Sequence, residues 1–194
     1  MKRYCKNVDI TDRYFISIAV RDCIKKKLSR KDTIELFCQY SGLPYNAIHR
    51  IVKHDYSKGY IDGLIETVID GIRQEIIYQS YVVKPIHYQT KIDGNSGKVR
   101  QIGIQDVKQQ LYDYIAAYGL WELFTAKIGY YQCSALENKG QIFGVKALKK
   151  WVDDHHIRYA IQSDIRHFYD TIDIDVLKDM LRRDVKNEPL LHLT

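Results

Sequence analysis

One carboxylate follows directly after a run of alternating apolar and polar residues. Residues 157–163 alternate in polarity, which predicts a strand, and Asp164 follows on its less apolar side. Two aromatic residues, Phe168 and Tyr169, come shortly after it. Mg²⁺ prefers hard oxygen ligands and usually takes one or two carboxylates together with phosphate oxygens. Asp164 is therefore a candidate ligand for a nucleotide-bound metal ion, while its spacing alone also fits an aspartate that caps a turn.

Basic residues mark a second candidate site. Two short alternating runs, at residues 86–92 and 99–104, are separated by the turn-rich sequence Asp-Gly-Asn-Ser-Gly, which predicts a β-hairpin. Lys91, Lys98 and Arg100 lie on it. The planar guanidinium of arginine donates two parallel hydrogen bonds to phosphate oxygens. These residues predict a phosphate-binding hairpin, with a solvated basic face as the alternative.

The segment from Asp164 to Ile172, Asp-Ile-Arg-His-Phe-Tyr-Asp-Thr-Ile, resembles the first palm motif of reverse transcriptases of the bacterial group II intron, retron and prophage type. The resemblance implies that Asp164 is the first metal-binding aspartate and that the backbone carbonyl of Ile165 lies near the second metal ion. It also implies that Tyr169 lies under the incoming sugar, where its ring would collide with a ribose 2′-hydroxyl. Core packing is the alternative role for Phe168 and Tyr169.

Residues 96–104, Ser-Gly-Lys-Val-Arg-Gln-Ile-Gly-Ile, resemble the fingers motif of the same family. By this resemblance Arg100 contacts the triphosphate of the incoming nucleotide, and Lys98 and Lys91 add positive charge. Residues 130–141 are similar to the connecting segment of prophage-type members. This chain has Asn138-Lys139-Gly140 where Gly-Arg-Gly is common.

A basic stripe is predicted on the helix that follows this segment. Lys146, Lys149 and Lys150 share one face by their helical spacing and could follow a phosphate backbone. A plain solvent-exposed face is the alternative.

The family's second catalytic motif, Tyr-x-Asp-Asp, is missing from this sequence. No adjacent aspartate pair follows Asp164, and Asp153-Asp154 precedes it. Two-metal catalysis needs carboxylates that hold both ions about 3.5–4 Å apart. We therefore expect no polymerase activity from this chain alone. The resemblance implies a parent RNA-directed DNA polymerase that uses two Mg²⁺ ions, an RNA template, a DNA primer and deoxynucleoside triphosphates (dNTPs), with the remaining palm and thumb supplied in cis or in trans.

The predicted architecture is α+β, because helices and strand-like runs occur without a regular β-α-β alternation. Helical periodicity covers about residues 12–80, begins again after Asp106 in a sequence with the form of a capping box, and returns at about 141–152 and 174–181. Apolar residues recur at helical spacing in two parts of the first stretch: Phe15, Ile18, Val20, Ile24 and Leu28, and then Ile61, Leu64, Ile65, Val68, Ile69 and Ile72. In the helix at 141–152 the residues expected to face inward are Ile142, Val145, Leu148, Trp151 and Val152. We predict an N-terminal helical region (1–80), a fingers-like region (81–155) and the start of a palm (156–194), as in a right-hand polymerase.

Residues 33–53 allow a different function. They resemble a helix-turn-helix, with Gly42 at the turn and Tyr45, Asn46 and His49 placed to face a DNA major groove. On this interpretation the protein is a noncatalytic nucleic-acid-binding module. An αα-hairpin that packs on the fingers gives the same pattern.

Composition favours a polyanionic partner. The 194 residues carry a formal net charge of +6 and have a pI of about 9.0. The four cysteines lack metal-ligand and disulfide-framework spacing. No leader-like or membrane-length apolar run occurs in the sequence, so we expect a cytoplasmic protein without membrane contact.

Overall fold

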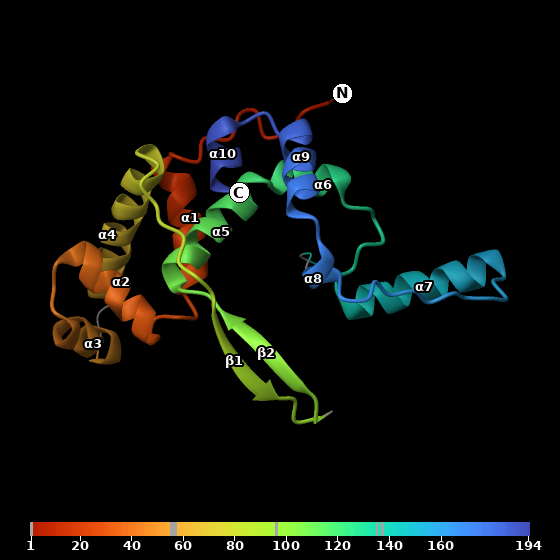
Figure 1. Ribbon diagram of the computed structural model, residues 1–194, viewed down its shortest axis with the longest axis horizontal. Coiled ribbons are helices and arrows are strands. Elements are labelled where there is room, and N and C mark those ends of the chain that lie inside the picture. Colours follow the sequence, from red (N-terminus) through yellow and green to blue (C-terminus); the bar gives the residue numbers. More distant parts are fainter. Residues whose placement is uncertain (1, 55–57, 96, 135, 137) are drawn as a thin grey trace. The chain divides into compact units, whose positions relative to one another are not determined.

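The protein combines ten helices with one two-stranded sheet in the part of the chain that the structure describes (Figure 1). The structure is a computed structural model, and it describes residues 2–54, 58–95, 97–134, 136 and 138–194. This mixture confirms the α+β class. The chain divides into two compact units, one made of residues 5–121 and 187–194 and the other of residues 2–4 and 122–186. We call them the helical unit and the C-terminal unit.

The helical unit is built on four N-terminal helices, as the periodicity predicts. They are α1 (Arg13–Ile24), α2 (Lys31–Ser41), α3 (Tyr45–His54) and α4 (Lys58–Ile77). Asp12 caps α1 by accepting a hydrogen bond from the amide of Phe15, and Gly42 ends α2 in the left-handed region at φ 71°. α1 packs against α4, and α2 packs against α3 and α4. Their apolar faces form the core.

The core confirms most of the predicted inward positions. The predicted apolar face of α4 is buried at Leu64, Ile65, Val68, Ile69 and Ile72. In α1 the predicted face was partly wrong. Ile18 is 42% exposed while its neighbours on the other side of the helix, Ile16 and Ala19, are fully buried, because α4 and α5 both pack on the side that carries these two residues.

Helix α5 (Val107–Gly119) completes this core and packs against α1 and α2. Asp106 caps it by accepting a hydrogen bond from the amide of Lys108. The predicted reciprocal half of a capping box does not form, since Oε1 of Gln109 has no hydrogen-bond partner among the described residues. The short C-terminal helix α10 (Glu188–Leu193) buries Leu190 against Gly119.

The predicted hairpin is present in the helical unit, as β1 (His87–Ile92) paired antiparallel with β2 (Val99–Ile104). Its register pairs Tyr88 with Gly103 and Lys91 with Arg100. Neither strand buries any residue. The hairpin therefore projects from the helices instead of joining their core (Figure 1).

The C-terminal unit contains α7 (Gln141–His155), α8 (Phe168–Thr171) and α9 (Ile174–Asp184), preceded by α6 (Trp121–Lys127), in which the two units meet in sequence. A single parallel bridge joins Tyr4 to Val185. Apolar side chains remain exposed along α7 and α9: Ile142, Val145, Leu148, Trp151, Val152, Ile174, Leu177 and Met180. The prediction that the α7 residues of this set face inward was wrong, because the described residues cover only part of that side of α7.

The prediction of a strand at residues 157–163 was also wrong. The segment forms no strand, and Tyr159 and Ile161 are 89% and 96% exposed. A strand is stable only when a neighbour takes up its backbone hydrogen bonds, and none of the described residues pairs with this segment.

Candidate functional site

The hairpin carries its predicted basic residues on one face. Residues directly opposite each other across an antiparallel pair share a face, so Lys91 and Arg100 lie side by side. Both are exposed. Two like charges at opposite positions destabilise a sheet, and Arg100 offsets this repulsion with an ion pair to Asp93, at 3.0 Å. Lys98 lies in the loop directly before β2. The hairpin thus presents a cationic surface, on which Arg100 forms an ion pair with Asp93.

The other face of the hairpin is less polar. Tyr88, Ile92 and Val99 are all more than 60% exposed there. The ring of Tyr88 lies across Gly103, where an added Cβ would be 3.5 Å from its Cε1 atom. The two faces thus differ in charge: one carries Lys91 and Arg100, while the strand residues of the other, which also include Thr90 and Gln101, are uncharged.

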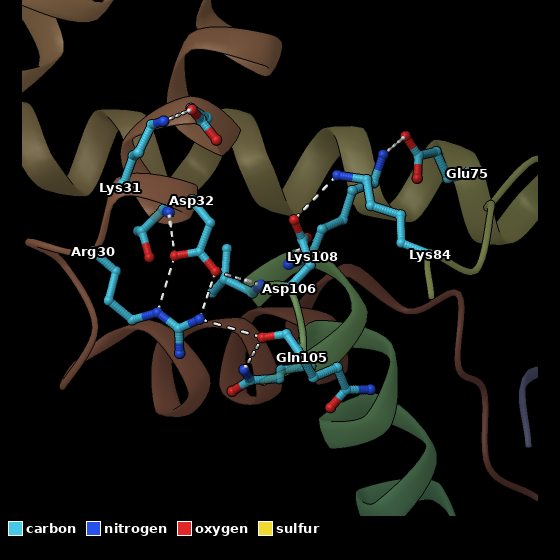
Figure 2. A network of polar contacts seen from close by, with 12 residues as sticks. Arg30, Lys31, Asp32, Glu75, Lys84, Gln105, Asp106 and Lys108 are labelled. Carbon is cyan, nitrogen blue, oxygen red and sulfur yellow. Dashed lines mark hydrogen bonds and ion pairs between the residues drawn. The ribbon is translucent and has the colours of Figure 1, made fainter. Parts of the chain in front are cut away.

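Polar contacts hold the base of the hairpin on the helices (Figure 2). Before β1, Lys84 forms an ion pair with Asp106, at 3.1 Å. After β2, Arg30 donates to the backbone oxygen of Gln105, at 3.3 Å, and the carboxylate of Asp32 accepts from the amide of Val107, at 2.9 Å. An isolated two-stranded hairpin is marginally stable, so these contacts at both ends position the cationic face.

Asp32 is central to this base. Arg30 donates to both of its carboxylate oxygens, at 2.9 and 2.6 Å. Burial raises the pKa of Asp32, but the Arg30 guanidinium and the Val107 amide outweigh that effect, so the pKa lies below its ordinary value. The carboxylate therefore stays ionised and keeps both partners at neutral pH.

A second polar cluster lies beside the first, between α2, α4 and α5. The carboxylate of Glu75 accepts hydrogen bonds from Lys108, at 2.7 Å, from Tyr40, at 2.9 Å, and from Tyr112. The side chains of Glu75 and Lys108 are only 18% and 17% exposed. Burial raises the pKa of Glu75, yet its three donors outweigh burial and lower it overall. Burial and the Glu75 carboxylate raise the pKa of both tyrosines.

The segment that carries Asp164 is exposed and lies between two histidines with positive φ. His156 ends α7 at φ 48°, and His167 precedes α8 at φ 52°. Asp164 is exposed, Ile165 is 65% exposed, and Tyr169 is 88% exposed with its ring 5.5 Å from that of Phe168. The proposed core role of Tyr169 therefore finds no support in this unit.

Asp164 and the carbonyl of Ile165 offer two of the oxygen ligands that Mg²⁺ accepts. Across the described residues, no group of three or more histidine, cysteine, aspartate or glutamate side chains is arranged to hold a metal ion. The oxygens of Asp164 and Ile165 are donors of the kind that Mg²⁺ takes together with phosphate oxygens, and one side-chain carboxylate is too few for two ions.

The structure separates the predicted residues into two sets. Lys91, Lys98 and Arg100 belong to the helical unit, whereas Asp164, Ile165, Tyr169 and the α7 lysines belong to the C-terminal unit. Lys146, Lys149 and Lys150 are exposed on α7, as predicted. No helix in the described part of the chain is both long and apolar enough to cross a membrane.

Two features escaped sequence analysis. The Glu75 cluster joins residues from positions 40, 75, 108 and 112, which no local pattern connects. On the C-terminal unit, Tyr130 and Tyr131 approach Phe143 and Trp151 of α7. The only signal for the second feature is the recurrence of aromatic residues at 130, 131, 143 and 151.

Comparison of the chain with protein-family models, curated proteins and solved structures gives no match.

Proposed function

We propose that this chain is the fingers and the first palm segment of an RNA-directed DNA polymerase of the reverse transcriptase type. The observation that carries the proposal is the hairpin, which presents Lys91 and Arg100 side by side on an exposed face with Lys98 at its loop. The order of the two motifs, hairpin before the Asp164 segment, also matches the family. In this proposal the hairpin binds the triphosphate of the incoming dNTP.

In the complete enzyme, Asp164 and the carbonyl of Ile165 would hold Mg²⁺, which supplies charge neutralisation for the phosphates. Arg100 binds the triphosphate with its planar donors, while Lys91 and Lys98 raise the local positive potential. Tyr169 excludes a 2′-hydroxyl by its bulk. The exposed segment 157–163 would become a strand of the palm sheet once partner strands are supplied in cis or in trans, and these would carry the missing carboxylates.

Nucleotide binding tests the hairpin directly. We expect Arg100→Ala to weaken binding of a fluorescent dNTP in Mg²⁺ by about tenfold or more, as for loss of a charge-assisted hydrogen bond. Asp93→Asn should strengthen binding by up to about fivefold, because it removes the carboxylate that competes for Arg100 at a surface ion pair.

Arg182→Ala is the matched control, since the Arg182 side chain is 66% exposed, compared with 62% for Arg100, and also pairs with an aspartate, Asp179, at 3.1 Å. If the Arg100 and Arg182 replacements weaken dNTP binding equally, the hairpin does not bind the triphosphate.

Primer extension tests the catalytic expectation. The purified chain should extend no primer on an RNA template with dNTPs and Mg²⁺, because Asp164 is a single carboxylate. Extension that is abolished by Asp164→Ala would contradict this expectation and show that the chain holds a complete catalytic centre.

A second candidate function, duplex DNA binding, has its own observation. Helices α2 and α3 flank a short turn with Gly42 in the left-handed region, and α3 buries Ile48 while exposing Asn46, His49 and Arg50. α3 carries no acidic residue. Duplex binding that is lost in Asn46→Ala/His49→Ala but kept in Arg100→Ala would favour this function over nucleotide binding.

A further inference from the structure

A continuous row of five aromatic rings lies on the C-terminal unit, outside the residues assigned above. The rings follow the order Phe143, Tyr130, Tyr131, Trp151 and His155, and successive centroids lie 5.7, 5.1, 6.1 and 5.6 Å apart. We call this row the aromatic ladder. Tyr130, Tyr131 and Trp151 are 69%, 59% and 49% exposed. These exposed fractions leave part of each of the three side chains accessible to a ligand.

A cavity of about 330 Å³ opens beside the ladder. Tyr131, Cys133, Gly144, Ala147, Leu148 and Trp151 line it. Gly144 lets the loop approach α7, since a Cβ there would lie 3.2 Å from Sγ of Cys133. The lining is apolar and aromatic, which suits a flat ring that stacks and enters edgewise.

Three lysine side chains, those of Lys139, Lys146 and Lys150, lie beside the aromatic ladder. The ammonium group of Lys139 lies 5.1 Å from the ring centroid of Tyr130 and 5.3 Å from that of Phe143. On α7, Lys146 follows Phe143 by three residues, and Lys150 follows Lys146 by four. Residues at these spacings are neighbours on a helix surface, so Lys146 and Lys150 lie next to the side of α7 that carries Phe143. The acidic residues of α7, Asp153 and Asp154, are confined to its last turn. A ligand along the first three turns therefore meets rings on one side and lysines on the other.

We propose that the aromatic ladder and its lysines bind single-stranded nucleic acid, with bases stacked on Tyr131 and Trp151 and phosphates facing Lys139, Lys146 and Lys150. Single-strand binding proteins combine these same two elements, stacking rings and a basic track. A duplex hides the faces of its bases, so an unpaired strand is the form that fits. This surface uses other residues than the triphosphate site on the hairpin, so the proposal goes beyond that site.

Tryptophan fluorescence reports the contact. Trp121 and Trp151 are the two tryptophans of the chain, so a Trp121→Phe background leaves Trp151 as the reporter. Titration with twelve-residue oligo(dT) and oligo(rU) should quench Trp151, and the two arms tell whether DNA or RNA is preferred. Tyr131→Ala should weaken binding by about five- to hundredfold, as for loss of one stacked base. Tyr14→Ala, at a 74% exposed tyrosine of α1, is the control and should change nothing.

Replacing the lysines allows a second measurement, which is valid even if the Tyr131→Ala variant does not fold. Lys146→Ala/Lys150→Ala should reduce the slope of log affinity against log salt by about 1.4, since each phosphate contact on a single strand contributes about 0.7. The titrations contain neither dNTP nor Mg²⁺, so their outcome is independent of the polymerase proposal. An unquenched Trp151, duplex bound as tightly as single strands, or an unchanged salt slope would each overturn the aromatic ladder as a single-strand site.

Discussion

Replacing Glu75 with alanine should lower the free energy of unfolding by about 3 kcal/mol, the lower end of the cost of removing one partner from a buried ion pair. The substitution leaves the ammonium group of Lys108 and the hydroxyls of Tyr40 and Tyr112 inside the helical unit without their common acceptor. Urea unfolding at neutral pH measures the loss, with an unchanged dependence on urea concentration.

Glu35→Ala is the control for this effect. Its carboxylate pairs with Lys31 at 3.6 Å, and the Glu35 side chain is 55% exposed. Removing it should cost less than about 1 kcal/mol, as for other surface ion pairs. If the Glu75 and Glu35 replacements cost the same, the buried cluster contributes no more than a surface pair.

The Glu75 effect should also depend on pH. The pKa of Glu75 is lower in the folded protein than in the unfolded chain, where the pKa of a glutamate is about 4.3. Its contribution is therefore complete above that value and is lost as the pH falls through the lower, folded pKa. The stability difference between the wild type and Glu75→Ala should shrink in acid. A difference that stays constant down to acid unfolding would contradict this assignment.

Two glycines of the same helix should respond to alanine with opposite signs. At Gly71 an added Cβ would lie 2.2 Å from both Cδ1 and Cε1 of Tyr40. The ring has little freedom to move away, because its hydroxyl donates to Glu75 and the ammonium group of Lys108 lies 5.3 Å from its centroid. Gly71→Ala should destabilise the protein by about 1–3 kcal/mol through overpacking.

At Gly63 no neighbouring atom lies within 4 Å of an added Cβ. Gly63→Ala should therefore stabilise α4 by up to about 1 kcal/mol, the difference in helix propensity between the two residues. Thermal unfolding of both variants checks the pair. Stabilisation by Gly71→Ala would show that α2 and α4 can separate at this point, and that Tyr40 does not fix their distance.

Sequence patterns predicted the features that depend on local order. The hairpin follows from two alternating runs and a turn, and the face of α4 follows from helical periodicity. Patterns failed where another segment decides the outcome. The alternating residues 157–163 lack a described partner strand, and the described residues leave most of the apolar side of α7 exposed. Periodicity states which residues share a face, but it does not state what covers that face.

The candidate site divides in the same way. Lys91 and Arg100 lie opposite each other because the hairpin register aligns them, and this could be expected from the two runs. The ion pair between Arg100 and Asp93 could not, since it depends on side-chain conformations. The anchoring of Gln105 by Arg30 and the aromatic ladder could not either, since they join residues from distant positions.

The loop between β1 and β2 decides which chemistry each side of the hairpin displays. Gly97 adopts φ 66° there, and its amide donates to the carbonyl of Asp93, at 2.8 Å. A slip of one residue in β2 would bring Gln101 opposite Lys91 and send Arg100 to the side of Tyr88, whereas a slip of two would keep all cations together. A change of register by an odd number of residues therefore separates Arg100 from Lys91 and mixes the two faces, whereas an even number keeps both cations on one face.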